Sequence, residues 1–309
     1  MARRPRSAKP RRSLAGRLVG WLVKAVFAFL ILSILWVLIY RFVPPPITAT
    51  MMGDLLGGRG VEKDWTPLER IDRDMVRAAI AGEDGKFCSH TGFDADAITQ
   101  AMIRNARGGR IRGGSTISQQ TAKNAFLWQG GGYFRKALEA WFTLLIENMW
   151  GKRRIMEVYL NIAETGIGTY GVEAGAQRYF DHGADAMTRT EAARIAAVLP
   201  LPKERGAVAP KGFTRRYGNS IAARIGVVAR DGLDACVYEG VAAPRDTTPA
   251  ATKRAEPRPK AKASTPAPLP GEEYEGEAAP IEAAPPEPVD PEPPAAEPVE
   301  DEPPALNGL

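Results

Sequence analysis

The sequence predicts a mainly α-helical protein with an apolar helix near its start, one folded unit and a proline-rich end. Two observations support this. Stretches between residues 72 and 229 repeat apolar side chains at the three- and four-residue spacing of helices that bury one face, and none shows a convincing alternation typical of β-strands. Residues 241–309 are dominated by Pro, Ala and Glu, which cannot bury a core, so we expect a disordered, extended tail.

The first two segments form a basic tail, residues 1–17, and a transmembrane helix, residues 18–42. The apolar run is long enough, at about 1.5 Å per residue, to cross about 30 Å of hydrocarbon. A cleaved signal peptide is the alternative, but Pro44-Pro45-Pro46 follows the run in place of a small-residue cleavage site. The arginine-rich start predicts a cytoplasmic N-terminus in the bacterial inner membrane, with everything after the helix in the periplasm.

A glycine-rich linker, residues 43–64, then leads to the folded unit, residues 65–240. Within that unit, glycine pairs and runs mark the breaks between helices, and Asp or Thr residues mark several helix starts. The expected helices cover residues 72–81, 94–105, 115–124, 133–149, 152–162, 169–180, 190–199 and 215–229.

The net charge and the few histidines and cysteines limit the classes of ligand and site that the protein can have. The net charge of +5 suits an anionic substrate or a lipid surface and is too small to favour nucleic acid. His90 and His182 are too few and too distant for a histidine metal cluster, and His90 is expected to hold a loop. A bridge between Cys88 and Cys236 is possible in an oxidising compartment, but we expect free thiols because Cys88 lies in the candidate active-site segment.

Two acids define that segment. Glu83 ends an expected helix beside Asp84, where an apolar neighbour could raise its pKa and make it a general base near neutral pH. A solvated surface acid is the alternative. Glu139 lies on a later helix, where the alternative is a surface salt bridge to Arg135 one turn earlier.

Polar and cationic side chains lie between and around the acids. Ser115, Thr116, Gln119 and Gln120 follow a glycine turn and offer donors and acceptors for sugar or phosphate oxygens, although a simple helix cap is the alternative. Lys123, Arg135, Lys136 and Lys152 could bind a pyrophosphate. The aromatic residues at 126–128 and 133–134 could enter the outer leaflet or pack in the core.

Taken in order, these segments resemble the monofunctional peptidoglycan glycosyltransferases, also called transglycosylases. The resemblance covers about residues 65–205. It rests on five ordered motifs: Glu83-Asp84-x-x-Phe87-x-x-His90-x-Gly92, Gly113-x-Ser115-Thr116-Ile117-x-Gln119-Gln120, Arg135-Lys136-x-x-Glu139, Lys152-x-x-Ile155-x-Glu157-x-Tyr159-Leu160-Asn161 and Gly168-x-Tyr170-Gly171-x-Glu173-Ala174.

The resemblance implies a lysozyme-like bilobal domain that polymerises lipid II into β-1,4 glycan strands with inversion, releasing undecaprenyl pyrophosphate. It implies that Glu83 deprotonates the acceptor 4-hydroxyl and that Glu139 assists the donor side. No cofactor is required, although a divalent metal such as Mg²⁺ at Glu139 is possible. The implied substrate-binding residues are Asp84, Ser115, Thr116, Gln119, Gln120, Lys123, Asn124, Arg135 and Lys136.

The expected partners are lipid II, the growing lipid-linked glycan, the membrane and possible cell-wall synthesis or division proteins, with no nucleic acid. The partner of the C-terminal tail is unknown. The transpeptidase motifs Ser-x-x-Lys and Lys-Thr-Gly do not follow residue 205, which predicts a monofunctional enzyme. Two alternatives remain open: a lytic muramidase on a similar fold, and a non-catalytic assembly factor that recruits partners through the tail.

Overall fold

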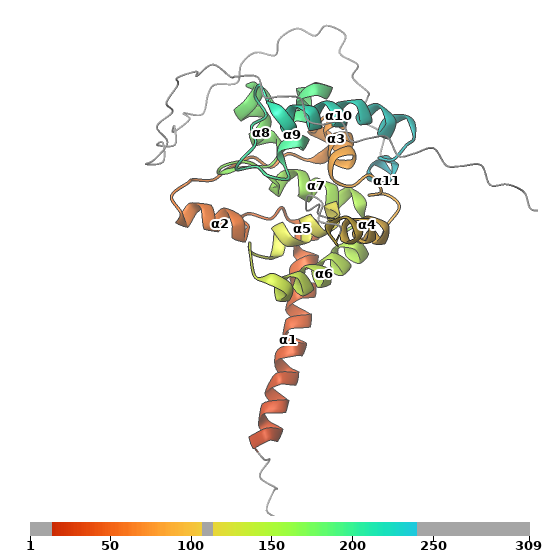
Figure 1. Ribbon diagram of the computed structural model, residues 1–309. Coiled ribbons are helices and arrows are strands. Elements are labelled where there is room, and N and C mark those ends of the chain that lie inside the picture. Colours follow the sequence, from red (N-terminus) through yellow and green to blue (C-terminus); the bar gives the residue numbers. More distant parts are fainter. Residues whose placement is uncertain (1–13, 107–113, 240–309) are drawn as a thin grey trace, which may run out of the picture. The chain divides into compact units, whose positions relative to one another are not determined.

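The computed structural model describes residues 14–106 and 114–239. The predicted basic tail and the predicted disordered tail lie almost wholly outside these residues. The described chain is mainly helical, as predicted (Figure 1).

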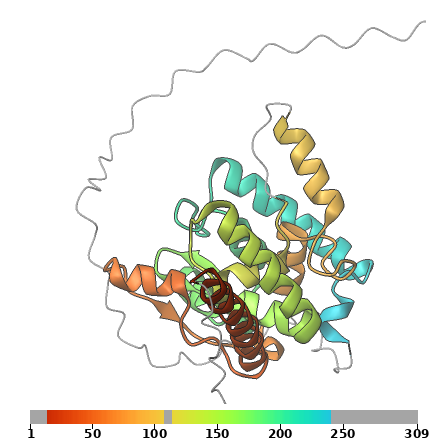
Figure 2. The same ribbon diagram turned by 90° about the horizontal axis from the view of Figure 1, so that it is seen from below.

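The long first helix, α1 (Leu14–Phe42), is the one described helix long and apolar enough to cross a membrane. It begins four residues before the predicted transmembrane segment. Its C-terminal part is attached to the folded unit, because the indole of Trp150 donates to the Val37 carbonyl at 2.8 Å and the Arg154 guanidinium donates to the Tyr40 carbonyl at 2.8 Å. Figure 2 shows α1 beside α6 (Gly132–Met149).

Two expectations about local structure were wrong. Part of the expected linker forms α2 (Ala49–Leu56), which begins where Thr48 accepts a hydrogen bond from the backbone N–H of Met51. Three short strands also form a small sheet of order β1-β3-β2, with β1 parallel and β2 antiparallel to β3. Strands of two or three residues are too short to show alternation in a sequence. They are β1 (Glu62–Lys63), β2 (Glu164–Gly166) and β3 (Thr169–Tyr170).

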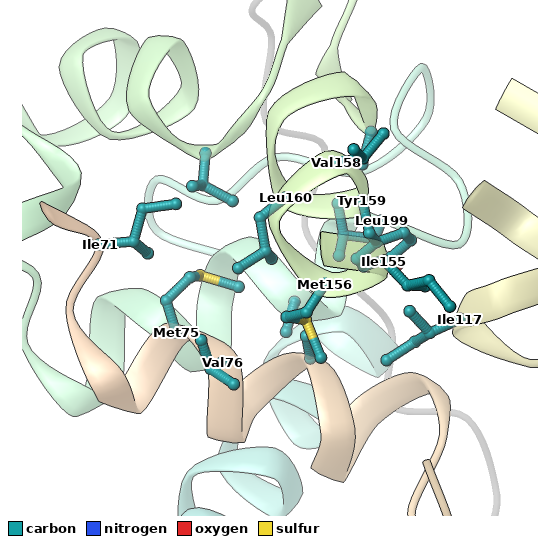
Figure 3. Close-up of a cluster of buried hydrophobic side chains, with 14 of the residues drawn as sticks. Ile71, Met75, Val76, Ile117, Ile155, Met156, Val158, Tyr159, Leu160 and Leu199 are labelled. Atoms are coloured by element: carbon teal, nitrogen blue, oxygen red, sulfur yellow. The ribbon is translucent and has the colours of Figure 1, made fainter. Parts of the chain in front are cut away.

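The core is centred on α7 (Lys152–Ile162), whose side chains are buried from Ile155 onward on most of its surface. In Figure 3, Leu160 of α7 points toward Met75 of α3, and Met156 of α7 also points toward α3. One group of packed helices contains α3, α9 and α10, and another contains α5, α6 and α7, in agreement with the expected bilobal arrangement. Their bounds are α3 (Arg73–Glu83), α5 (Ile117–Phe126), α9 (Arg189–Val198) and α10 (Gly212–Arg230).

Smaller elements complete the unit and surround these groups. The predicted helix at 169–180 begins later than expected, as α8 (Val172–Phe180), because β3 and the glycine at 171 precede it. The others are η1 (Leu68–Arg70), α4 (Ala95–Ala106), η2 (Ala184–Ala186) and α11 (Ala235–Tyr238).

Cys88 and Cys236 form a disulfide, so the expectation of two free thiols was wrong. Their separation of 148 residues hides the fact that α11 returns to the loop after α3. Buried Asp234, just before α11, pairs with Arg73 at 2.9 Å and Arg77 at 3.0 Å, both on α3. These ion pairs hold α11 beside α3 and the loop that contains Cys88. The disulfide therefore ties the loop that follows Glu83 to the end of the described chain.

Candidate active site

Glu83 is the last residue of α3 and is partly buried. Its Oε2 accepts a hydrogen bond of 2.9 Å from the Gln120 side chain, and its Oε1 is buried without a hydrogen-bond partner among the described residues. Burial raises the pKa of Glu83, and the charge of Asp84 adds to this, although the Gln120 bond and the charges of Arg205 and Lys123 oppose it. A carboxylate in this state accepts a proton more readily than an ordinary glutamate.

Asp84 is buried and connects α3 to α5. Its carboxylate lies 3.0 Å from Nε2 of His90 and accepts the backbone N–H of Ile117, the first residue of α5, at 3.0 Å. Because Nδ1 of His90 accepts the N–H of Gly92, Nε2 carries the hydrogen and donates it to Asp84. The expectation that His90 holds the Glu83 loop is confirmed.

Gly92 ends this loop at a position that only glycine fits. Its φ is +97°, and a Cβ atom would lie 2.8 Å from a methyl of Thr143 on α6. The carbonyl of Gly92 in turn accepts the hydroxyl of Thr116 at 2.7 Å. The loop is thereby held against both α5 and α6.

The polar run at 115–120 divides into two roles. Thr116 and Gln119 are buried in a capping box, in which the side chain of each binds the backbone N–H of the other. Ser115 is exposed, and Gln120 reaches Glu83. Of these residues, Ser115 and Gln120 therefore face the site, while Thr116 and Gln119 shape the start of α5.

Glu139 has different surroundings, on the buried side of α6 with only 2% of its surface exposed. Arg135 donates to its Oε2 at 2.7 Å, and Lys136 pairs with its Oε1 while also lying 3.4 Å from the Ser115 hydroxyl. The salt bridge from Arg135 to Glu139, which was the alternative interpretation of Glu139 as a surface residue, is present, but the carboxylate is buried. Both oxygens of Glu139 are thus occupied by cations.

Lys123 and Asn124 are half-buried on α5. Burial lowers the pKa of Lys123, as do the neighbouring charges of Arg135 and Lys136, whereas the charges of Glu139 and Glu83 raise it. Lys123 therefore lies within electrostatic range of both glutamates. Lys152, by contrast, pairs with Glu147 at 2.7 Å and lies over the ring of Phe87, so it stabilises the loop that follows Glu83.

A cavity of about 110 Å³ opens beside Glu83. It is lined by Glu83, Asp84, Gly85, Asp94, Ala97, Gly114, Ser115 and Thr116. Its lining combines three acidic side chains with the exposed Ser115.

Sequence reasoning missed three residues around Glu83. The hydroxyl of Tyr217 on α10 donates to the carbonyl of Gly82 at 2.7 Å, and the charge of Arg205 lowers the pKa of Glu83. The Tyr159 hydroxyl is buried without a hydrogen-bond partner among the described residues, and its pKa is raised mainly by burial and further by the charge of Glu83. Only the position of Tyr159 within the fourth motif could have indicated it.

The side chains around Glu139 do not fit a divalent metal. Metal ions such as Mg²⁺ prefer several oxygen ligands, whereas the neighbours of Glu139 are Arg135 and Lys136. Across residues 14–106 and 114–239, no group of three or more His, Cys, Asp or Glu side chains is arranged to hold a metal ion. The cations suit an anionic group instead.

Comparisons with known proteins show the family of the chain. The Transglycosylase family model matches residues 49–225, more than half of the chain. A biosynthetic peptidoglycan transglycosylase of Caulobacter vibrioides is 49% identical over 222 residues, covering 72% of this chain and 97% of the relative. Proteins of the same name from Jannaschia sp. and Rhodospirillum centenum are 42% and 43% identical to this chain, respectively. The two alignments cover 76% and 74% of this chain and 99% of each relative.

The match extends across both glutamates, the disulfide-linked loop and most of α10. It also begins at α2, inside the segment that the sequence suggested was a linker. The chain belongs to the transglycosylase family, a family of glycosyl-transferring enzymes.

Proposed function

We propose that the protein polymerises lipid II into β-1,4 glycan strands of peptidoglycan, with inversion and release of undecaprenyl pyrophosphate. The observation that carries this proposal is the contrast between two glutamates. Glu83 is partly buried, with a raised pKa and one oxygen that has no hydrogen-bond partner among the described residues, whereas Glu139 is paired with two cations. A base and an anion site are the two requirements of a transfer from a pyrophosphate donor.

In the proposed reaction, Oε1 of Glu83 removes the proton from the acceptor 4-hydroxyl. The oxygen then attacks the anomeric carbon of the donor, a new C–O bond forms, and the bond from that carbon to the pyrophosphate oxygen breaks. Attack on the face opposite the leaving group inverts the configuration. Asp84, which binds His90 and the start of α5, would fix the loop that follows Glu83.

On the donor side, Arg135, Lys136 and Lys123 would neutralise the negative charge that develops on the departing pyrophosphate. Glu139 keeps Arg135 and Lys136 in position through two ion pairs on the same helix face. Ser115, Gln120 and Asn124 would contact the sugars. Thr116 and Gln119 would act indirectly, by holding the start of α5.

A lipid-linked donor requires a protein close to the membrane. We propose that α1 is a single-pass anchor with a cytoplasmic N-terminus, which is supported by its length and by the mean hydropathy of 2.7 over an 18-residue stretch of the helix. The exposed side chains of Tyr133 and Phe134, at the start of the helix that packs on α1, offer an apolar surface to the outer leaflet. The Cys88–Cys236 disulfide supports an oxidising compartment such as the periplasm.

The test is a polymerisation assay with labelled lipid II and the full chain in detergent. We expect long glycan from the unaltered protein and none above background from Glu83→Gln or Glu139→Gln. Arg216→Ala is the control, because Arg216 is an exposed residue of α10 that is not among the charges acting on Glu83, and this variant should polymerise normally. Full polymerisation by Glu83→Gln, or soluble fragments released from purified sacculi without synthesis, would overturn the proposal.

A further inference from the structure

A second, larger cavity of about 460 Å³ lies between α9 and α10. These helices are at the opposite end of the folded unit from the one at which α1 leaves it (Figure 1). The cavity's residues follow the helical repeat: Arg215, Asn219 and Ala222 share one face of α10, and Thr190 and Arg194 share one face of α9. The loop before α10 contributes Ala209, Pro210 and Lys211, and Gly218 completes the lining.

The lining is cationic. Arg194, Lys211 and Arg215 contribute to it and no Asp or Glu does. Within the described part of the chain, none of these three cations has an ion-pair partner, whereas Arg189, just before the cavity on α9, pairs with Asp74 at 3.2 Å. Like charges around one cavity repel each other, so an anion bound there would relieve the repulsion.

The size and the arrangement of the cations narrow the ligand. A volume of about 460 Å³ falls within the range of small-molecule sites and exceeds what a single inorganic anion fills. Guanidinium groups bind carboxylates through paired hydrogen bonds, and here the two arginines come from different helices. That arrangement fits an organic ligand with separated carboxylates, with Thr190 and Asn219 as neutral hydrogen-bonding groups.

We propose that this cavity is an accessory binding site for the carboxylate-bearing peptides of peptidoglycan. The inference rests on the proposed function, because the substrate and product of that reaction carry such peptides. Its position at the end remote from α1 disfavours lipid headgroups as ligands. Helix α10 lines the cavity and also contacts the backbone beside Glu83, because the Tyr217 hydroxyl donates to the Gly82 carbonyl. One helix therefore connects the cavity to the site at which a glycan chain would bind Glu83.

The test measures binding of a lipid-free, fluorescently labelled disaccharide-pentapeptide to the full chain in detergent. Three proteins are compared in the Glu83→Gln background: the parent, Arg194→Ala/Arg215→Ala, and Arg216→Ala as a control that removes one arginine of α10 outside the cavity lining. We expect the Kd of the double variant to rise at least about tenfold and that of the control to stay unchanged. The same disaccharide without its peptide should bind equally to all three.

Two further measurements separate loss of binding from unfolding and from failure of the proposed function. If the double alanine variant unfolds, Arg194→Lys/Arg215→Lys replaces it: this variant keeps both charges but loses the paired guanidinium hydrogen bonds, so its Kd should rise measurably, by less than that expected for the alanine variant. Equal binding of the peptide-bearing fragment by all variants would overturn the inference, as would displacement by inorganic phosphate at the fragment's own concentration. Polymerisation of lipid II by the unaltered protein, measured on the same preparation, separates this failure from failure of the proposed function.

Discussion

Glu83 and Glu139 are both glutamates at the ends of recognisable motifs, yet the structure surrounds them in opposite ways. Glu83 has one amide donor and a second, buried oxygen without a hydrogen-bond partner among the described residues, and burial raises its pKa. Glu139 is more deeply buried, but Arg135 and Lys136 occupy both of its oxygens. The number of cations paired with each carboxylate, rather than how deeply it is buried, therefore distinguishes Glu83 as a proton acceptor from Glu139 as part of an anion site.

The largest expected effect is on the rate of the Glu83→Gln variant. Loss of the general base should lower glycan polymerisation by about 10²–10⁴-fold. Its stability should move the other way at neutral pH. Because the folded state raises the pKa of Glu83, the unfolded state ionises first as pH increases, so ionised Glu83 destabilises the fold above the ordinary value of 4.5.

Thermal melting of Glu83→Gln and the parent across pH measures that second effect. The variant should melt at a higher temperature at pH 7, and the difference should vanish below about pH 4, where both forms are neutral. A variant that melts at a lower temperature at pH 7 would show that Glu83 is a structural carboxylate.

The next largest effect is on stability and concerns the Cys88–Cys236 disulfide, which lies on the Glu83 side of the site and has no counterpart at Glu139. The Cys88→Ser/Cys236→Ser variant opens a loop of 148 residues and should lose about 2–5 kcal/mol of unfolding free energy. Denaturant unfolding, with the reduced parent as a second sample, measures it. An unchanged midpoint would mean that the contacts of Asp234 with Arg73 and Arg77 hold α11 without the disulfide.

The disulfide also marks the limit of what the sequence predicts. Helices such as α3, α5 and α6 follow from local periodicity and capping residues, and the ordered motifs identify Glu83 and Glu139. The pairing of Cys88 with Cys236, the contact of Asp84 with the N–H of Ile117 and the Tyr217 bond to Gly82 join segments far apart in the chain. α2 was missed because its glycine-rich surroundings favour a loop locally, while packing against α5 favours a helix.

A smaller effect is expected from Glu139→Gln on stability, in contrast to Glu83→Gln. Two charge-assisted contacts become weak, and Arg135 loses its buried partner, so the unfolding free energy at pH 7 should fall by about 1–3 kcal/mol. Arg135→Lys keeps the charge and is the conservative control. A Glu139→Gln variant as stable as the parent would remove the structural half of the contrast between the two glutamates.

The smallest effect should be a shift in the pH profile, and it addresses the electrostatics of Glu83 directly. The polymerisation rate should rise with pH as Glu83 loses its proton, with a midpoint above 4.5 because its pKa is raised. The positive charge of Arg205 lowers that pKa, so Arg205→Gln should move the midpoint to higher pH. Arg216→Gln removes a charge of the same sign from the exposed face of α10 and should leave the midpoint in place. A profile that moves equally in both variants would indicate a general effect of net charge, and one that moves in neither would assign the titration to a group other than Glu83.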